Sequence, residues 1–252
     1  MFHWSVLLLI CANILHRHFA VMNDEMTRNP AQTKERIVMA LPNSYKIVDT
    51  AHWKRKLHCE IFRNAFQPHF SVCLELDITH FLKRVKENKW PFSLAFIHTV
   101  TKCANEIEEF RYRFLNGDVV LYETIHTSFT YLNADTELFK VLNVPMTENI
   151  EEYIKVAKET IENQKEYITG PVPNDVYQFS SLPWIKFTNL THTYAGPSEK
   201  SNPMFDWGKF FERDGKVWVP FAVQVHHSFV DGFHVGKLTT KLQEYLDRFP
   251  AI

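Results

Sequence analysis

Short segments in which apolar and polar residues alternate indicate strands along much of the chain. The clearest is residues 73–77, where Leu74 and Leu76 flank Glu75, a pattern typical of a strand with one buried face. Further strands are expected over residues 119–122, 127–132, 137–141 and 177–180. Residues 204–212 and 217–225 are expected to form a hairpin around a turn at residues 213–215.

Apolar residues that recur every three or four positions predict helices. One helix is expected to begin after Asp77 or Thr79, either of which can cap it, and it carries Phe81, Leu82 and Val85 on one face. Three more helices are expected over residues 94–107, 148–167 and 235–248. The first turn of the helix over 148–167 is rich in glutamate, which is favourable at the positive end of the helix dipole.

The order of these elements is mixed rather than strictly alternating, which favours the α+β class. We expect a two-layer sandwich in which helices cover one side of a mixed β-sheet. No stretch rich in proline or glycine divides the main body, and no internal repeat is evident. Residues 41–252 are therefore expected to form a single domain.

The first 40 residues differ from this main body. Residues 6–15 are apolar, but a membrane span needs about 20 such residues, so no membrane anchor is expected. The run has the length of a signal-peptide core, yet no Lys or Arg precedes it. We interpret residues 1–40 as a poorly ordered leader or a stretch before a later start, with a secretory signal as the alternative.

The composition is that of a globular protein, because 45% of the 252 residues are apolar and 23% are charged. The chain has only 7 glycines and no G-x-G-x-x-G or G-x-x-x-x-G-K-[ST] sequence, which argues against the common Rossmann and P-loop nucleotide sites. The formal net charge of −1 gives no basic surface for nucleic acid or an anionic membrane, so neither is expected as a partner.

The cysteines and scattered histidines give no sign of a metal centre. Four cysteines, at positions 11, 59, 73 and 103, form no C-x-x-C pair. Buried free thiols in a reducing compartment, the cytoplasm, are the simplest interpretation. His98, His192 and His234 are more often packed or solvated residues than ligands in such an arrangement, so no metal is expected.

The densest group of reactive side chains follows the last expected strand, in the run His226-His227-Ser228-Phe229-Val230-Asp231-Gly232. Neighbouring residues of a strand point to opposite faces, so only one of the two histidines can face a given cleft. A neutral imidazole there can take a proton from a hydroxyl near neutral pH. Asp231 could either orient that imidazole or pair with an arginine. The pattern alone indicates acyl transfer with a histidine base.

The motif belongs to a longer series of matches. These are Trp53 to Lys56, Cys73 to Thr79, Glu109 to Arg111, Phe129-Thr130, Ser180 to Trp184, and Pro220 through His227 to Val235. In this order the segments resemble the trimeric chloramphenicol acetyltransferase family, with a fold of the CoA-dependent acyltransferase type. The resemblance covers about residues 45–246.

The resemblance implies O-acetylation of the primary hydroxyl of chloramphenicol, with acetyl-CoA as co-substrate and antibiotic resistance as the biological setting. His227 matches the general base of the family, and Ser180 matches the serine that stabilises the tetrahedral oxyanion. Asp231 and Arg55 match a structural ion pair. Direct transfer within a ternary complex is implied, and so is a homotrimer with each active site at a subunit interface.

The positions that would bind the acceptor match less closely. Ile61, Phe62 and Phe66 lie over a segment that usually presents two aromatic residues and an aliphatic one, and Phe139 is a further candidate. These four are the expected acceptor-binding residues. The alternative for the first three is that they are plain core residues.

Charged residues near the site also leave alternatives open. Asp206 stands where the family commonly has a small hydroxyl residue, so it either changes the charge at the reaction centre or points to solvent from an edge strand. Lys209 matches a family lysine that binds coenzyme A, and Lys89 is a looser candidate. Either lysine could be an ordinary surface residue.

Two other functions remain open. One is the same acyl transfer to a different small hydroxyl acceptor, and the other is a catalytically idle trimeric binding protein. The presence of both His227 and Ser180 disfavours the idle protein. A transferase core that depends on an acyl carrier would need a carrier module, and 252 residues leave no room for one.

Overall fold

A seven-stranded mixed β-sheet is the centre of the structure, a computed structural model that describes residues 43–192 and 199–249. Its strands are β2 (His69–Asp77), β5 (His126–Asn133), β6 (Leu138–Val144), β7 (Val176–Leu182), β8 (Met204–Gly208), β9 (Phe211–Arg213) and β10 (Lys216–His226). They lie in the order β2-β10-β8-β7-β5-β6, with β9 paired to the start of β10. β7 runs parallel to both of its neighbours and the remaining pairs are antiparallel.

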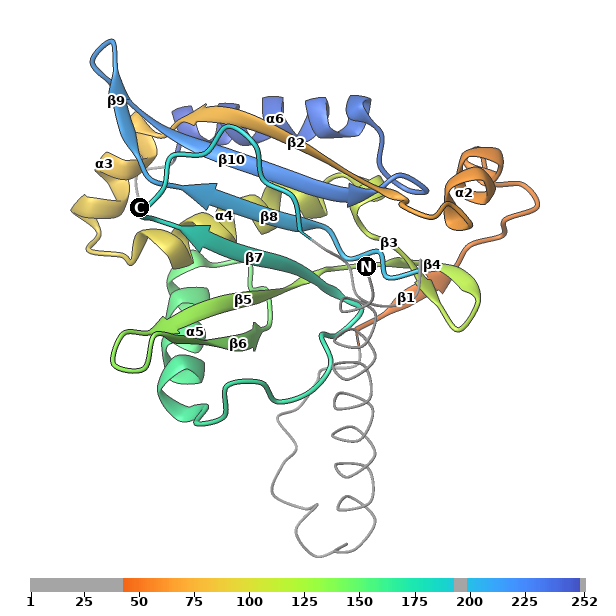
Figure 1. Ribbon diagram of the computed structural model, residues 1–252, viewed down its shortest axis with the longest axis horizontal. Coiled ribbons are helices and arrows are strands. Elements are labelled where there is room, and N and C mark those ends of the chain that lie inside the picture. Colours follow the sequence, from red (N-terminus) through yellow and green to blue (C-terminus); the bar gives the residue numbers. More distant parts are fainter. Residues whose placement is uncertain (1–42, 193–198, 250–252) are drawn as a thin grey trace, which may run out of the picture. The chain divides into compact units, whose positions relative to one another are not determined.

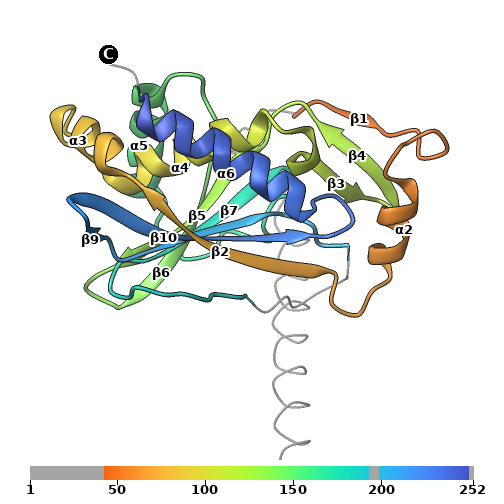
Figure 2. The same ribbon diagram turned by 90° about the horizontal axis from the view of Figure 1, so that it is seen from above.

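Four helices cover one face of this sheet (Figure 2). They are α3 (Thr79–Glu87), α4 (Phe92–Asn105), α5 (Ile150–Asn163) and α6 (Gly232–Asp247). The helix α4 lies between the sheet and its neighbouring helices and is buried along most of its length. Its Phe96 ring packs edge-on against Trp207 and Phe221 of the sheet. The expected α+β two-layer sandwich is therefore confirmed.

A second, three-stranded sheet stands at one end of the main sheet (Figure 1). It consists of β1 (Tyr45–Ile47), β4 (Asp118–Tyr122) and β3 (Tyr112–Leu115), and the helix α2 (Lys56–Arg63) and the 3-10 turn η2 (Glu108–Phe110) lie beside it. Buried Arg113 ties the two sheets together, because its guanidinium donates to the carbonyls of Phe110, Asn174 and Val176. The sequence pattern predicted the strand at 119–122 but not that it belongs to a separate sheet.

The two faces of the main sheet carry different side chains. Phe179, Phe205 and Phe221 are in contact on the helix side. Their neighbours one position along, Ser180, Asp206 and Ala222, lie in register on the opposite face. A segment that we call the strap, residues 183–192, crosses this second face (Figure 1).

The strap is pinned to the sheet by side chains of the face that it crosses. Ser71 Oγ donates to the Leu190 carbonyl at 2.8 Å, and the Gln224 amide bonds both backbone groups of His192. Among the described residues, the strap crosses β10 and β8, and no described segment crosses the outer face of β7 and β5 (Figure 1). This open half of the face carries the Ser180 hydroxyl.

Two predicted elements differ from the structure. Residues 204–212 do not form one continuous strand. Between β8 and β9, the Lys209 N–H donates to the Ile185 carbonyl of the strap and not to a neighbouring strand of the sheet. The helix expected over 148–167 begins only after Asn149, whose side chain caps it, and ends at Asn163. The helix α3 was expected to be capped by Asp77 or Thr79. In the structure Ile78 occupies the cap position, and Asp77 Oδ1 accepts a hydrogen bond from the Thr79 N–H at the start of the helix.

The proposed leader, residues 1–40, lies outside the described residues. Within the described ranges no helix is long and apolar enough to cross a membrane. The described residues form one compact unit that starts at Asn43, and the domain boundary at residue 41 stays a prediction.

Candidate active site

The two adjacent histidines at the end of β10 have different surroundings. His226 is buried, and its Nδ1 accepts the Ser228 N–H at 3.1 Å. His227 leaves the strand, bonds the Pro68 carbonyl through its N–H at 2.8 Å, and keeps 35% of its side chain exposed. Of the pair, His227 is therefore the one that can meet a substrate.

The imidazole of His227 is fixed in both position and tautomer. Its ring stacks on Phe62, with the centroids 3.9 Å apart and the planes at 17°. Its Nδ1 lies 3.2 Å from the Val230 carbonyl oxygen and 3.2 Å from Asp231 Oδ1. Because both of these atoms are acceptors, Nδ1 carries the proton, and the lone pair of Nε2 is left to accept another.

Arg55, which stands at the start of α2, organises the loop that follows His227. Its two terminal nitrogens donate to both carboxylate oxygens of Asp231 at 2.7 Å. The same guanidinium donates to the carbonyls of Ser228 at 3.0 Å and His227 at 3.2 Å. This hydrogen bonding holds the pKa of Asp231 below its ordinary value, so its carboxylate stays charged at neutral pH.

A further layer of charged groups lies behind Asp231. The Asp231 N–H donates to His234 Nδ1 at 3.0 Å, and His234 Nε2 lies 3.4 Å from Glu109 Oε1. Burial lowers the pKa of His234, which favours its neutral form. His234 and Glu109 thus support the loop from its inner side, and no spacing in the sequence pairs them.

The Ser180 hydroxyl lies on a different part of the sheet, near the carboxyl end of β7. Thr130 on β5 donates its hydroxyl proton to Ser180 Oγ at 3.3 Å. Since a hydroxyl has one proton to donate, this bond leaves the proton of Ser180 free for another acceptor. Ser180 is therefore suited to donate a hydrogen bond on the open face.

Asp206 is directly beside Ser180 in the parallel register of β8 and β7, and only 1% of it is exposed. The expectation that it points to solvent from an edge strand is wrong, because β8 lies in the middle of the sheet. Its Oδ1 is 2.9 Å from Nε2 of His192 on the strap. This bond raises the pKa of His192. From the sequence, His192 was interpreted as an isolated residue. Its contact with Asp206 depends on the path of the strap, which brings it over β8.

Ser180 and His227 are not brought together within one chain. Ser180 is level with Asp206, and Asp206 is level with Ala222 on β10, five residues before His227. With about 3.3 Å per residue along a strand and about 4.8 Å between strands, their backbones are roughly 15–20 Å apart. In one chain the two side chains therefore belong to different parts of the sheet.

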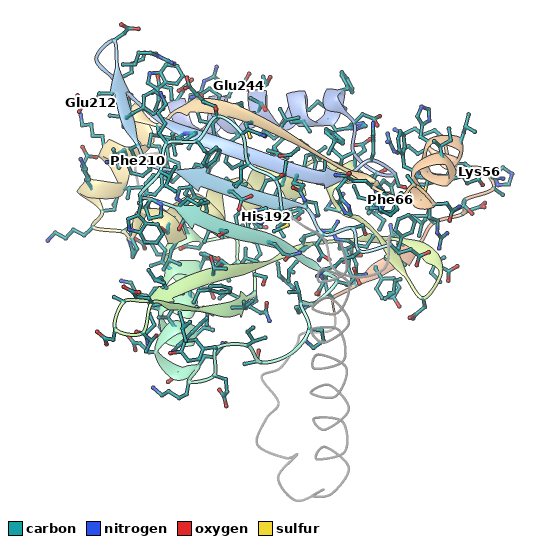
Figure 3. All side chains as sticks on the ribbon, viewed as in Figure 1. Lys56, Phe66, His192, Phe210, Glu212 and Glu244 are labelled. Atoms are coloured by element: carbon teal, nitrogen blue, oxygen red, sulfur yellow. The ribbon has the colours of Figure 1, made fainter. Side chains whose placement is uncertain are left out.

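The expected acceptor-binding residues form two apolar patches at opposite ends of the protein. At one end Ile61 and Phe66 are exposed beside Phe62, so the alternative that they are core residues is wrong for these two (Figure 3). At the other end, Phe139 and Leu132 are exposed cross-strand neighbours near the tip of the β5–β6 hairpin. Figure 1 shows this hairpin at the end of the molecule away from α2. Exposed apolar patches of this kind mark surfaces that bind partners.

The exposed Lys209 follows β8 at the end of the strap. The strap passes close to the preceding residue, Gly208, where a Cβ would lie 2.6 Å from the Ile185 carbonyl oxygen. Lys89 is also exposed and adopts a left-handed backbone, with φ at 56°. The Phe92 ring contacts that of Phe210 at 4.5 Å, so both lysines belong to the same end of the sheet.

Other reactive groups do not form a centre of their own. In residues 43–192 and 199–249 no group of three or more His, Cys, Asp or Glu side chains is arranged so that it could hold a metal ion. Cys59, Cys73 and Cys103 are free thiols, and Cys11 lies outside the described residues. Burial raises the pKa of Cys59 and brings that of Cys103 to about 12, which leaves neither thiol ready to act as a nucleophile.

Comparisons with known proteins bear on the family and the fold of this chain. The sequence profile described as "CAT: Chloramphenicol acetyltransferase" matches residues 43–243. A chloramphenicol acetyltransferase of Klebsiella sp. is 34% identical over 209 residues, which cover 81% of this chain and 95% of that protein. A solved chloramphenicol acetyltransferase superposes with a TM-score of 0.74 at 27% identity, covering 81% of this chain and all of the other. A dihydrolipoamide acetyltransferase of Listeria monocytogenes, at 13% identity and a TM-score of 0.55, shares the fold.

Proposed function

The chain belongs to the chloramphenicol acetyltransferase family, and we propose that it transfers the acetyl group of acetyl-CoA to the primary hydroxyl of chloramphenicol. The observation that carries this proposal is the setting of His227. Its Nδ1 faces two acceptors, and its ring is stacked on Phe62 and partly exposed. Nε2 is therefore placed to accept the proton of a substrate hydroxyl.

The reaction follows from these positions. His227 Nε2 takes the proton of the acceptor hydroxyl as the oxygen attacks the thioester carbonyl of acetyl-CoA. The Ser180 hydroxyl donates to the oxyanion that forms, a contact of a kind worth about 2.7–4 kcal/mol. The intermediate then expels the thiolate of coenzyme A, which recovers the proton from the imidazolium. Acetyl passes directly within the ternary complex and the chain forms no acyl intermediate.

A homotrimer with its sites at subunit interfaces accounts for the separation of Ser180 from His227. The patch around Ile61 and Phe66 and the patch around Phe139 lie at opposite ends of the body (Figures 1 and 3). Two different patches that meet head to tail generate a ring when the rotation closes. In such a ring His227 of one subunit faces Ser180 of the next, and the apolar residues line the acceptor pocket between them.

Acetyl-CoA is proposed to approach from the end of the sheet that carries Lys209. An exposed ammonium there can pair with a phosphate of the coenzyme, and the close passage of the strap at Gly208 fixes where this lysine emerges. The three described thiols are free, which supports a reducing compartment, the cytoplasm, as the location. Residues 41–252 act as the single acetyltransferase domain, and resistance to chloramphenicol is the expected consequence of the activity.

The proposal is tested by thiol release from acetyl-CoA with the full-length protein. We expect release that depends on chloramphenicol and that is lost in His227→Ala, while His80→Ala, a change at an exposed histidine on α3, keeps the parent rate. No release from a folded trimer would contradict chloramphenicol as the acceptor.

A different hydroxyl acceptor is the second candidate, because the buried Asp206 and His192 form an unusual charged pair next to Ser180. A panel of alcohols in the same assay distinguishes that acceptor from an idle binding protein.

A further inference from the structure

Asp206 is a buried carboxylate next to the residue proposed to stabilise the oxyanion. It is in register with Ser180 on the neighbouring parallel strand, and strands lie about 4.8 Å apart. A negative charge at this place opposes the formation of a second negative charge beside the Ser180 hydroxyl. The acyl-transfer step therefore requires that the charge of Asp206 be compensated.

In the described part of the chain, His192 is the group placed to compensate it. The imidazole Nε2 bonds Asp206 Oδ1 at 2.9 Å, whereas Oδ2 has no hydrogen-bond partner among the described residues. Of the side chains level with Asp206 on this face, Ser180 of β7 and Ala222 of β10 are uncharged, and β2 presents the thiol of Cys73.

Other titratable groups also lie on this face of the sheet. Glu75 of β2, two residues from Cys73, is paired with Lys186 of the strap at 3.9 Å and with Arg213 at 2.6 Å. His226 and His69 are paired in register two residues beyond Gln224 along β10. Residues 193–198, which follow His192, have no charged side chain in their sequence. Among the described residues, His192 is the one whose side chain bonds Asp206.

His192 is held in place by contacts that do not involve its ring. The Gln224 side chain accepts the His192 N–H at 2.8 Å and donates to its carbonyl at 3.2 Å, and Gln224 is itself buried. Ser71 pins the strap two residues earlier. The imidazole lies over the middle of the sheet with 29% of the side chain exposed (Figure 3). It can therefore exchange its proton with solvent while Asp206 cannot be reached.

We propose that His192 and Asp206 form a pair that keeps the charge beside Ser180 at zero by holding one proton between them, and that acyl transfer requires this proton. The inference rests on the proposed function, because it concerns the same reaction. Asp206 raises the pKa of His192, and burial raises the pKa of Asp206, so both shifts favour retention of the proton. Above the pKa of the pair the site carries a negative charge, and kcat falls about tenfold per pH unit while the acceptor KM stays constant.

The decisive test compares kcat at saturating chloramphenicol and acetyl-CoA for His192→Asn and for the double variant Asp206→Asn, His192→Asn. The single variant leaves Asp206 uncompensated and is expected to lower kcat about 10- to 100-fold at pH 7. The double variant removes the charge as well and is expected to recover to within about threefold of the parent, without the alkaline decline.

Ser71→Ala, which loosens the strap without changing a charge, serves as the control and is expected to keep the alkaline decline. A double variant as slow as His192→Asn would overturn the proposal, because it would show that the imidazole acts only by holding the strap.

A second measurement keeps this inference separate from the choice of acceptor. If the parent protein does not acetylate chloramphenicol, the proposed function fails, but the ring proton of His192 can still be titrated by NMR with labelled histidine. We expect its pKa above 6.5 in the parent and lower in Asp206→Asn. The same pKa of His192 in the parent and in Asp206→Asn would overturn the proposal that the two residues share a proton.

Discussion

Ser180 lies within the main sheet and His227 lies just beyond the end of β10, although the proposed reaction needs both side chains at one carbonyl group. Ser180 is level with Ala222 across two strand spacings, and His227 lies five residues beyond Ala222. Arg55 and Phe62 fix His227 at its end, so no local rearrangement brings it back over the sheet. We therefore expect an active site that uses both residues to be assembled from two copies of the chain.

The first prediction concerns the Ser180 hydroxyl. Ser180→Ala removes the free donor that Thr130 leaves to the open face, and kcat is expected to fall about 10²- to 10³-fold with little change in KM. Ser181→Ala is the matched control, since Ser181 is level with Trp207 on the helix side. Steady-state thiol release measures both variants. A Ser180→Ala enzyme that differs from the parent only in KM would contradict the assignment.

The second prediction concerns the ion pair between Arg55 and Asp231. Asp231→Asn weakens two hydrogen bonds of 2.7 Å and is expected to lower the free energy of unfolding by about 1–3 kcal/mol at pH 7. The pKa of Asp231 is lowered in the folded state, so the stabilisation is present at neutral pH and is lost as the pH falls through that pKa. The difference between the two proteins in urea unfolding should therefore shrink below about pH 4. An equal difference at pH 7 and pH 3 would be inconsistent with an ionic origin.

The third prediction uses two glycines with opposite surroundings. Gly208→Ala places a Cβ 2.6 Å from the Ile185 carbonyl oxygen and is expected to destabilise the fold by about 1–3 kcal/mol and to raise the KM for acetyl-CoA. Gly236→Ala, in α6 with nothing within 4 Å, is expected to stabilise by about 0.5–1 kcal/mol. Thermal unfolding and initial rates check both. An unchanged KM for acetyl-CoA in Gly208→Ala would show that the position of the strap does not affect coenzyme binding.

The fourth prediction concerns assembly. Phe66→Asp puts a charge into the exposed patch beside α2 and is expected to convert the proposed trimer to monomers and to abolish activity. Phe233→Asp, an equally drastic change at an exposed phenylalanine of α6 outside both patches, is expected to leave the trimer intact. Light scattering after gel filtration gives the mass of each. Trimers of Phe66→Asp would exclude this patch from the interface.

Local patterns predicted most of the main sheet and its helices. The strand β2 was recognised because its apolar residues alternate with polar ones. The helix α4 was recognised because apolar residues recur at helical spacing, although the structure buries most of this helix and not one face alone. The helix α2 was not predicted, because it buries only Cys59 and exposes the apolar side chains of Leu57 and Ile61. The strand β1 was missed for a related reason, since all three of its residues are exposed.

The candidate site was predictable where its residues are close in sequence. His227 and Asp231 are four residues apart, and the motif that contains them pointed to both. The pairing of His192 with Asp206 depends on the path of the strap, and that of His234 with Glu109 depends on how α6 packs. Contacts of this kind between distant segments leave no periodic signal in a sequence.

The most direct test of a site shared between subunits is complementation between His227→Ala and Ser180→Ala. Each variant alone is expected to be impaired by about 100-fold or more, but a mixed trimer contains one interface with an intact His227 on one side and an intact Ser180 on the other. When the two variants are co-expressed in equal amounts and assemble at random, about one quarter of all interfaces carry both intact residues. The mixture is therefore expected to recover about one quarter of the parent activity. Mixed trimers, verified by mass, that remain inactive would contradict the shared site.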